Sequence, residues 1–262
     1  QGYMDIKDKN IIITGASSGI GKQLSIDLAK QGANIILLSR KIKNLKIALK
    51  EVSKYSNLSS YYKCDISKEK EVNKIFKRII KKYKHVDILI NNAGFGIYKE
   101  FKDIKTKDIK DIFNTNYFGL IYCTKAILPT MLKRKSGMIV NIASVAGKSG
   151  YPGGSIYSAS KFAVIGLSET MYYELKNKGI KILVVCPGAV ETNFTKHPSY
   201  KKFNHKVRHK RIVSVDYVSK EIIKAIKKEK FEIIIPRFYK VVMMIKAIVP
   251  KFYMKMLERA TR

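Results

Sequence analysis

A tyrosine and a lysine lie four residues apart in the segment YSASK, residues 157–161, with only small residues between them. On a helix this spacing is about one turn, so both side chains project from nearly the same face. A phenol titrates near about 10, and a nearby ammonium lowers its pKa toward the range useful for acid–base catalysis. The same pair is also common on exposed helices, and the chain holds 16 Tyr and 52 Lys plus Arg. Whether this pair is catalytic depends on the rest of the chain.

A second segment with chemical potential is TGASSGIG, residues 14–21, which follows an apolar run and precedes a helical pattern. Glycines permit a tight turn and close approach to a pyrophosphate, and a helix N-terminus offers free N–H groups. The spacing departs from the more common G-x-G-x-x-G fingerprint, and a plain turn is the alternative. Between a strand and a helix, the segment predicts a dinucleotide site.

Seven apolar runs could form the strands that position these segments: 10–15, 34–39, 60–65, 86–93, 137–144, 180–188 and 231–236. Helix-length amphipathic intervals, such as 21–32 and 71–83, lie between them. Continuous apolar runs indicate strands buried on both faces, and their alternation with helices indicates a parallel sheet. We therefore expect an α/β fold: a Rossmann-type, doubly wound, seven-stranded parallel sheet with helices on both faces.

A single catalytic domain is expected over residues 4–236, because no linker, repeat or low-complexity segment divides the chain. Within it, residues 193–214 are expected to cover the substrate. Residues 237–262 form a basic, apolar extension. The first three residues are interpreted as a tag remnant, with Met4 as the native start.

The formal net charge of +32 would suit a protein that binds nucleic acid or a membrane surface. Only 8 of the 52 basic residues are Arg, however, whereas geometric recognition of phosphates favours the bidentate Arg fork. Abundant Ile, Asn and Lys instead indicate A/T-biased codons. We expect no nucleic-acid partner, and keep a nucleic-acid-binding or a nucleotide-sensing protein as the non-enzyme alternatives.

Cys64, Cys123 and Cys186 show no close pairing and lie in apolar or strand-like segments. This spacing predicts neither a disulfide framework nor a zinc site, and no metal is expected. The expected location is cytoplasmic, with peripheral contact at the inner membrane surface as an alternative.

Seven blocks, in order, make the chain resemble the short-chain dehydrogenase/reductase family from about residue 8 to residue 236. They are TGASSGIG at 14–21, CD at 64–65, NNAG at 91–94, Asn116 in NTNYFG, Ser144 in NIASVAG, YSASK at 157–161 and PGAVET at 187–192. Together in register they are far more specific than any one of them. The resemblance implies an oxidoreductase that reversibly reduces a ketone to a secondary alcohol with a nicotinamide cofactor.

The resemblance implies four catalytic residues. Tyr157 would protonate the ketone oxygen, while Lys161 would lower the pKa of Tyr157 and bind the nicotinamide ribose. Ser144 would hydrogen-bond the substrate oxygen where negative charge develops, and Asn116 would hold a water linking Lys161 to solvent. A serine hydrolase is disfavoured, because Ser144 does not lie in a G-x-S-x-G elbow and the four histidines fall outside the matching blocks.

The resemblance also implies a cofactor-binding set along the same blocks. Asp65 would accept a hydrogen bond from the adenine amino group, and Ile66 would pack on the ring. The other members are Gly15, Ser17, Ser18, Gly19, Ile20 and Gly21 in the first turn, Asn91, Ala93 and Gly94 near the adenosine ribose, Tyr157 and Lys161 again, and Pro187, Gly188, Val190 and Thr192 around the carboxamide.

The choice between the two nicotinamide cofactors depends on residues 39–41. An NAD site usually carries an acid after the second strand, to bind the ribose 2′-hydroxyl. Ser39 stands at that position here, and Arg40 follows, where it could pair with a 2′-phosphate. In so basic a chain an Arg at one position is weak evidence, so the missing acid carries more of the argument. We expect NADPH (NADP) as the cofactor.

The substrate is less defined. Residues 196–211 contain seven Lys or Arg, three His and no acid, which suits a solvated loop or the capture of an anionic carrier or substrate. A 3-oxoacyl-acyl-carrier-protein reductase therefore competes with a reductase of free lipid-like or steroid-type ketones.

The extension 237–262 mixes apolar residues with Lys, and its longest uncharged run, 241–245, is far below the ~20 residues that span a bilayer. Pro250 is predicted to break its helix. Apolar extensions of this kind resemble family members that reduce lipid-like carbonyls. Packing within the chain or on a subunit of a homodimer or homotetramer, contact with a membrane surface, and disorder remain alternatives; the short uncharged runs favour packing.

Overall fold

The computed structural model of the chain describes residues 4–194, 199 and 212–261. In these residues seven parallel strands form one sheet in the order β3-β2-β1-β4-β5-β6-β7. The strands are β1 (Asn10–Thr14), β2 (Asn34–Ser39), β3 (Ser60–Lys63), β4 (Ile88–Asn91), β5 (Gly137–Ile142), β6 (Ile180–Pro187) and β7 (Glu232–Ile235). The predicted doubly wound, seven-stranded α/β fold is confirmed.

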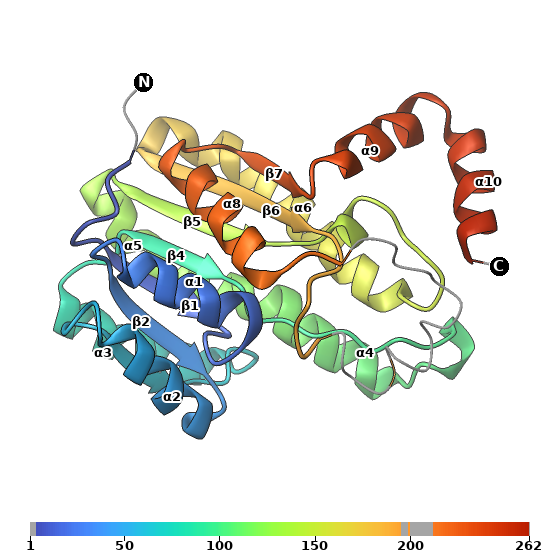
Figure 1. Cartoon of the computed structure of the whole chain (residues 1–262). Helices are drawn as coiled ribbons and strands as arrows, with labels where there is room; N and C mark the ends of the chain where they lie inside the picture. The colour runs from blue at the N-terminus through green and yellow to red at the C-terminus, as the bar shows by residue number, and fades with distance from the viewer. Residues whose placement is uncertain (1–3, 195–198, 200–211, 262) are drawn as a thin grey trace.

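Helices cover both faces of the sheet (Figure 1). On one face pack α1 (Gly19–Ala29), α2 (Ile42–Val52) and α8 (Val215–Lys227). On the other pack α3 (Glu69–Tyr83), α5 (Gly119–Arg134) and α6 (Ser155–Leu175). Each helix turns a buried apolar stripe toward the Ile- and Val-rich strands, which explains why those strands are apolar on both sides.

Shorter elements connect these layers. They are α4 (Thr106–Phe113), the 3₁₀ turns η1 (Phe101–Asp103), η3 (Val145–Gly147) and η4 (Lys176–Lys178), and the π-helical turn η2 (Asn114–Phe118) between α4 and α5. After β7 the chain forms α9 (Phe238–Ile248) and α10 (Pro250–Thr261), which stand off one end of the sheet (Figure 1). The break between them falls at Pro250, as predicted, because proline cannot continue the helix before it.

Three strands end about two residues before their apolar runs do. The runs that end at residues 65, 93 and 144 leave the sheet at Lys63, Asn91 and Ile142. The residues beyond these strand ends line a cavity at this edge of the sheet and do not pair with another strand.

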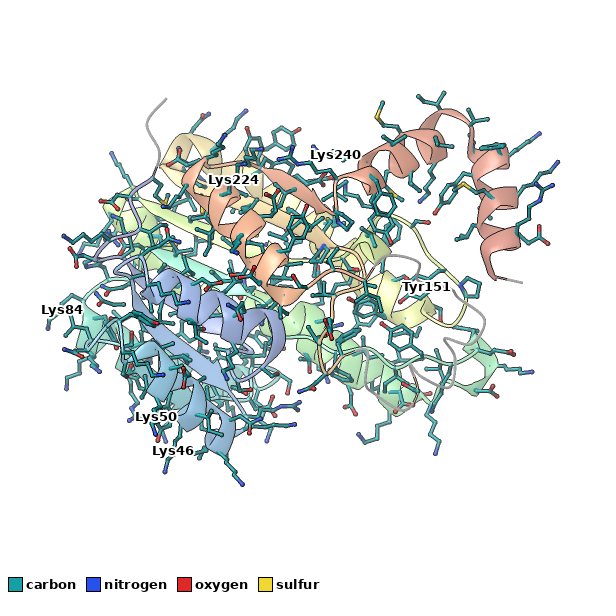
Figure 2. All side chains as sticks on the ribbon, viewed as in Figure 1. Lys46, Lys50, Lys84, Tyr151, Lys224 and Lys240 are labelled. Atoms are coloured by element: carbon teal, nitrogen blue, oxygen red, sulfur yellow. The ribbon has the colours of Figure 1, made fainter. Side chains whose placement is uncertain are left out.

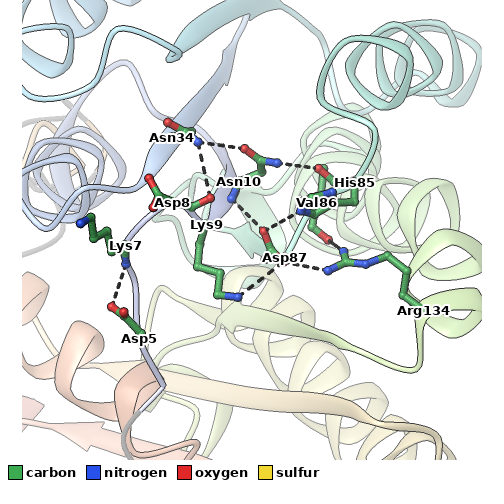
Figure 3. A network of polar contacts seen from close by, with 10 residues as sticks. All are labelled: Asp5, Lys7, Asp8, Lys9, Asn10, Asn34, His85, Val86, Asp87 and Arg134. Atoms are coloured by element: carbon green, nitrogen blue, oxygen red, sulfur yellow. Dashed lines mark hydrogen bonds and ion pairs between the residues drawn. The ribbon is translucent and has the colours of Figure 1, made fainter.

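At the opposite edge of the sheet, a polar network surrounds Asp87, which is 8% exposed (Figure 3). Its carboxylate accepts from the backbone N–H of Asn10 at 2.9 Å and from Arg134 at 3.0 Å. His85 and Lys9 lie at 3.5 and 3.9 Å from its oxygens. The network joins the start of β1, the start of β4 and the end of α5. It therefore stabilises the end of the sheet that lies opposite the cavity.

We expect Asp87→Ala to destabilise the protein by about 2–3 kcal/mol, because it leaves a buried N–H and a partly buried guanidinium without their acceptor. Urea unfolding measures this change. As a control, Glu51→Ala removes an exposed ion pair with Lys54 and should leave stability almost unchanged. Equal effects of the two substitutions would contradict the structural role given to the network.

Candidate active site

A cavity of about 860 Å³ lies at the carboxyl ends of the strands. In an open parallel sheet this edge is where ligands bind, where the strand order reverses. Most of the predicted site residues line it: Gly15, Ser17, Ser18, Gly19, Ile20, Ser39, Arg40, Asp65, Ile66, Ala93, Gly94, Ser144, Tyr157, Lys161, Pro187, Gly188, Val190 and Thr192. The cavity therefore brings together residues that are far apart in the sequence.

The glycine-rich turn between β1 and α1 allows close backbone approach at one end of the cavity. Gly15 has a φ of +66°, and a Cβ there would lie 2.9 Å from the Cα of Ala93. Gly19 has a φ of +53° at the first position of α1. Ser18 caps this helix without a side-chain hydrogen bond. The first N–H groups of α1 are thus available to an anionic group in the cavity.

Thr14 ties this turn to the end of β4. Its Oγ1 accepts from the backbone N–H groups of Asn92 and Ala93, each at 3.0 Å. The Nδ2 of Asn92 donates in return to the carbonyl oxygen of Thr14 at 2.8 Å. Two neighbouring strand ends are therefore locked in register beside the cavity. The sequence reasoning assigned Thr14 and Asn92 no role, although both lie inside motifs that it used.

At the end of β2 the residues expected to select the cofactor lie beside the glycine-rich turn. The hydroxyls of Ser17 and Ser39 are 2.8 Å apart, and the backbone N–H of Lys41 donates to Ser39 at 3.3 Å. The exposed side chain of Arg40 lines the same part of the cavity. Position 39 carries no carboxylate, and the two residues that follow it, Arg40 and Lys41, are basic.

Tyr157, Lys161 and Ser144 all line the cavity. The first two lie one turn apart near the start of α6, and the Lys161 Nζ is 5.9 Å from the centre of the Tyr157 ring. The Lys161 ammonium donates to the carbonyl oxygen of Ile142 at 2.8 Å. Ser144 donates to the carbonyl oxygen of Pro187 at 3.2 Å and accepts from Ala146 at 3.1 Å. One acid–base group, one cation and one small donor thus line one space.

Burial lowers the pKa of Lys161 to about 8, because a charged ammonium loses its hydration inside the protein. Lys161 is only 5% exposed, and the described residues place no carboxylate in hydrogen-bonding contact with its Nζ. At neutral pH the ammonium form still predominates. Its positive charge lies 5.9 Å from the centre of the Tyr157 ring.

Three predicted residues lie behind the cavity wall. A Cβ at Gly21 would meet the Nδ2 of Asn92 at 2.4 Å, so this glycine lets α1 pack against the end of β4. Asn91 donates to Asn141 on the neighbouring strand β5 and to Thr124 on α5. All three positions support the cavity lining from outside it.

Asn116, the third of them, lies in the π-helical turn η2. Its side chain accepts from the backbone N–H of Phe95 at 3.0 Å and donates to the Phe95 carbonyl oxygen at 2.9 Å. It also donates to the hydroxyl of Ser160 at 3.1 Å. A Cβ at Gly94 would fall 3.1 Å from Asn116 and 3.5 Å from the Lys161 Nζ. Asn116 and Lys161 therefore both approach Gly94, from the side of the turn η2 and from α6.

Aromatic rings surround the side chain of Tyr157. The rings of Tyr98 and Phe194 lie 6.1 and 5.4 Å from the Tyr157 ring, measured between centres. Tyr151 stacks on Tyr98 at 6.3 Å. Most of the segment expected to cover the substrate, 195–198 and 200–211, lies outside the described residues. The part that is described already makes this end of the cavity apolar.

The C-terminal helices close the far end of the cavity, a role that the sequence did not predict. The residues that line it from α9 and α10 are Phe238, Tyr239, Val242, Met243, Tyr253, Met256 and Leu257. Tyr253 is 4% exposed, and its hydroxyl lies 2.6 Å from that of Ser149. Lys246 donates to the carbonyl oxygen of Lys148 at 2.5 Å. Part of the extension thus packs within its own chain, one of the alternatives left open above.

The three cysteines are buried free thiols. Burial raises the pKa of Cys64 and of Cys186 to about 12 and that of Cys123 well above its usual range. Cys64 lines the cavity, but its thiol stays protonated at neutral pH and is a weak nucleophile. Covalent catalysis through cysteine is therefore disfavoured.

Comparison with known proteins defines the class. A family model described as short chain dehydrogenase matches residues 9–202. The chain is 33% identical to a 3-oxoacyl-acyl-carrier-protein reductase of Thermotoga maritima, over 73% of this chain and 78% of that protein. It is 40% identical to a farnesol dehydrogenase of Aedes aegypti, over 70% of this chain and 78% of that protein. The chain therefore belongs to the short-chain dehydrogenase/reductase family, which comprises oxidoreductases that act on CH–OH and C=O groups.

A solved structure agrees with this assignment. The structure of ElxO with NADP bound superimposes with a TM-score of 0.78 at 32% sequence identity, and covers 87% of this chain and 97% of that one.

The burial of Lys161 predicts a pH-dependent stability. Its ammonium titrates near 10.5 in the unfolded chain and near about 8 in the folded one. Between these values the unfolded chain binds more protons, so the contribution of Lys161 to the free energy of unfolding rises with pH. Relative to Lys161→Met, the cofactor-free wild type should gain up to ~1.4 kcal/mol per pH unit in this window. Urea unfolding of both proteins at several pH values measures the difference, and a constant difference would contradict the assigned pKa.

Proposed function

We propose that the protein is an NADPH-dependent reductase of apolar, lipid-like ketones. The observation that carries this proposal is the convergence of Tyr157, Lys161 and Ser144 on one cavity whose far end is lined by α9 and α10. Family membership supplies the reaction class. The residues of the cavity supply the cofactor preference and the substrate class, as argued below.

The nucleotide end of the cavity fits a dinucleotide. Gly15 and Gly19 line the cavity with positive φ angles, so the turn presents backbone without side chains to a bound group, while Gly21 lets α1 pack closely behind it. The N-terminus of α1 offers N–H groups and a positive dipole end to a pyrophosphate. Asp65 and Ile66 line the cavity beyond the ribose position and suit an adenine. The nicotinamide would be bordered by Pro187, Gly188, Val190 and Thr192.

The positive field near Arg40 supports NADPH over NADH. A guanidinium can bind a 2′-phosphate through two parallel hydrogen bonds, whereas the Ser39 hydroxyl repels no phosphate. ElxO, a relative at 32% identity, has been solved with NADP bound. Both observations favour the phosphorylated cofactor for this chain.

In the proposed mechanism each residue acts on a stated atom. NADPH, when bound, supplies the hydride that reduces the carbonyl carbon. The Tyr157 hydroxyl donates its proton to the carbonyl oxygen, which becomes the alcohol oxygen. The Ser144 hydroxyl exchanges its bond to the Pro187 carbonyl for one to the substrate oxygen. Lys161 stabilises the phenolate left behind, and Asn116 beside it orients the route by which solvent returns the proton.

The aromatic and aliphatic lining supports a lipid-like substrate. Tyr98, Tyr151 and Phe194 surround Tyr157, and methionines and aromatics of α9 and α10 continue this surface. Burial beside Tyr253 raises the pKa of Tyr239, so that phenol stays uncharged. Burial of a long apolar chain in this cavity would contribute about 25 cal/mol of binding free energy for each Å² of apolar surface. A small ketone has less apolar surface and would gain less. The 40% identical farnesol dehydrogenase acts, by its name, on an isoprenoid alcohol.

A second candidate is reduction of a 3-oxoacyl group carried by acyl carrier protein. The Thermotoga maritima relative bears that activity in its name, and a positively charged chain suits an acidic carrier. NADPH oxidation with a series of free ketones of increasing chain length, and with the matching carrier-bound 3-oxoacyl groups, distinguishes the two. Rising kcat/KM with chain length for free ketones supports the first candidate, and turnover of only carrier-bound groups supports the second.

Tyr157→Phe should lower turnover by orders of magnitude while NADPH binds almost as before, because the change removes the proton donor and little volume. Stopped-flow NADPH oxidation and cofactor fluorescence titration measure the two quantities. Tyr173→Phe removes an exposed hydroxyl from the same helix and is the matched control. Wild-type turnover by Tyr157→Phe would exclude the proposed acid.

Arg40→Ala should weaken NADPH binding by about 10- to 100-fold, the scale of one charge-assisted contact, and should barely affect NADH. Dissociation constants for both cofactors measure this split. Lys43→Ala removes a positive charge from the exposed side of α2 and corrects for the general field. Equal losses for NADPH and NADH in Arg40→Ala would show that Arg40 does not read the 2′-phosphate.

A further inference from the structure

Exposed apolar side chains gather on the outward side of α9, at the turn after it and on α10, and we name this group the outer face. It consists of Val241, Met244, Ile248, Val249, Phe252 and Met254, each between 49% and 74% exposed. The opposite side of α9 lines the cavity, whereas on α10 Phe252 and Met254 lie on two different sides of the helix, with Lys251 and Lys255 between them. A helix that borders water on its outer side normally carries polar residues there. The outer face therefore calls for a partner that removes it from water.

Basic residues flank the outer face. Lys240 lies at the start of α9 (Figure 2), and Lys251, Lys255 and Arg259 are exposed along α10. From residue 237 to residue 262 the sequence has seven Lys or Arg and a single acid, Glu258. The partner should therefore combine an apolar interior with negative charge around it.

A second copy of this chain does not meet that requirement. Each copy carries a formal net charge of +32, and symmetric pairing of two outer faces would bring lysines of one copy against lysines of the other. Like charges opposed across an interface weaken association and slow the encounter.

We propose that the outer face docks on the surface of an anionic lipid bilayer, with α9 and α10 lying in the plane of the interface. The apolar side chains enter the region of the acyl chains, while Lys240, Lys251 and Lys255 extend to the headgroups. The two helices have 11 and 12 residues. Within the described residues no helix is long and apolar enough to cross a membrane.

The outer face is also continuous with the cavity. Met256 lines the cavity and is 36% exposed, so the apolar wall of the site reaches the surface that we assign to the bilayer. Docking at this position brings the cavity within one helix diameter of the acyl chains.

A tryptophan probe tests the proposal directly, because the chain contains no Trp. In Phe252→Trp the added fluorophore should shift to the blue on addition of phosphatidylcholine–phosphatidylglycerol vesicles, and brominated acyl chains should quench it. Leu58→Trp is the matched control, since Leu58 is 65% exposed in the loop before β3 and outside the outer face. Absence of quenching in Phe252→Trp, or equal quenching in Leu58→Trp, would overturn the proposal.

Vesicle sedimentation supplies a second, independent measurement. The wild type should sediment with vesicles that contain phosphatidylglycerol, less so at high salt, and less with phosphatidylcholine alone. The double variant Ile248→Glu, Phe252→Glu should partition at least about 100-fold more weakly, because it sets two charges in the apolar layer. The double variant Ile47→Glu, Leu58→Glu adds the same two charges outside the outer face, at residues 51% and 65% exposed, and should bind like the wild type.

Sedimentation velocity without lipid tests whether the outer face instead binds a second copy of the chain. The proposal expects the wild type and the double variant to have the same oligomeric state and the same turnover of a short, soluble ketone. A smaller oligomer in the double variant, together with no vesicle binding by the wild type, would show that the outer face joins copies of the chain and would refute the proposal. Wild-type binding to an acidic protein without any binding to vesicles would refute it as well.

Discussion

The site depends on the shared direction of the seven strands. In a parallel sheet every carboxyl end meets the same edge, so segments that follow β1, β2, β3, β4, β5 and β6 converge without any long-range contact to specify them. The hydrogen bonds of Thr14 to Asn92 and Ala93 then fix two of those ends to each other. The polar network of Asp87 anchors the opposite edge, so chemistry and anchoring occupy different ends of the same strands.

Inside this fold the site contains one group whose burial is unfavourable, the ammonium of Lys161. A buried ammonium without a carboxylate contact costs folding free energy, which the low pKa of Lys161 expresses. The carbonyl of Ile142 limits this cost without neutralising the charge. A carboxylate partner would stabilise the ammonium better, but it would also cancel the positive charge beside Tyr157. In the mechanism that we propose, the site gives up some stability for an acid–base group that works near neutral pH.

Much of this arrangement could be predicted from the sequence. Six of the seven predicted strands are rich in Ile, Leu or Val, because strands buried on both faces must be apolar throughout. The edge strand β3, with the sequence SYYK, is only partly buried. Three strand ends were predicted too long, at residues 64–65, 92–93 and 143–144, because no pattern in the sequence separates the last paired residue from the residues that follow it into the cavity wall. The fold-back of the extension could not be predicted. Ser149 and Tyr253 are 104 residues apart, and no local pattern signals a bond between two hydroxyls at that separation.

The extension also shows why a helix can be apolar almost all round without belonging to a core. Tyr239, Met243 and Tyr253 face the cavity, whereas Met244, Ile248 and Phe252 face outward, so two separate surfaces demand apolar residues from the same short segment. Periodicity alone cannot distinguish this case from a helix buried in a subunit interface, since both lack a polar stripe. Charge distinguishes them. Lysines at the margins of the outward side would oppose their own copies across a subunit interface, but they complement an anionic surface. The composition of the extension is therefore accounted for when one of its sides forms the wall of the site and the other meets lipid.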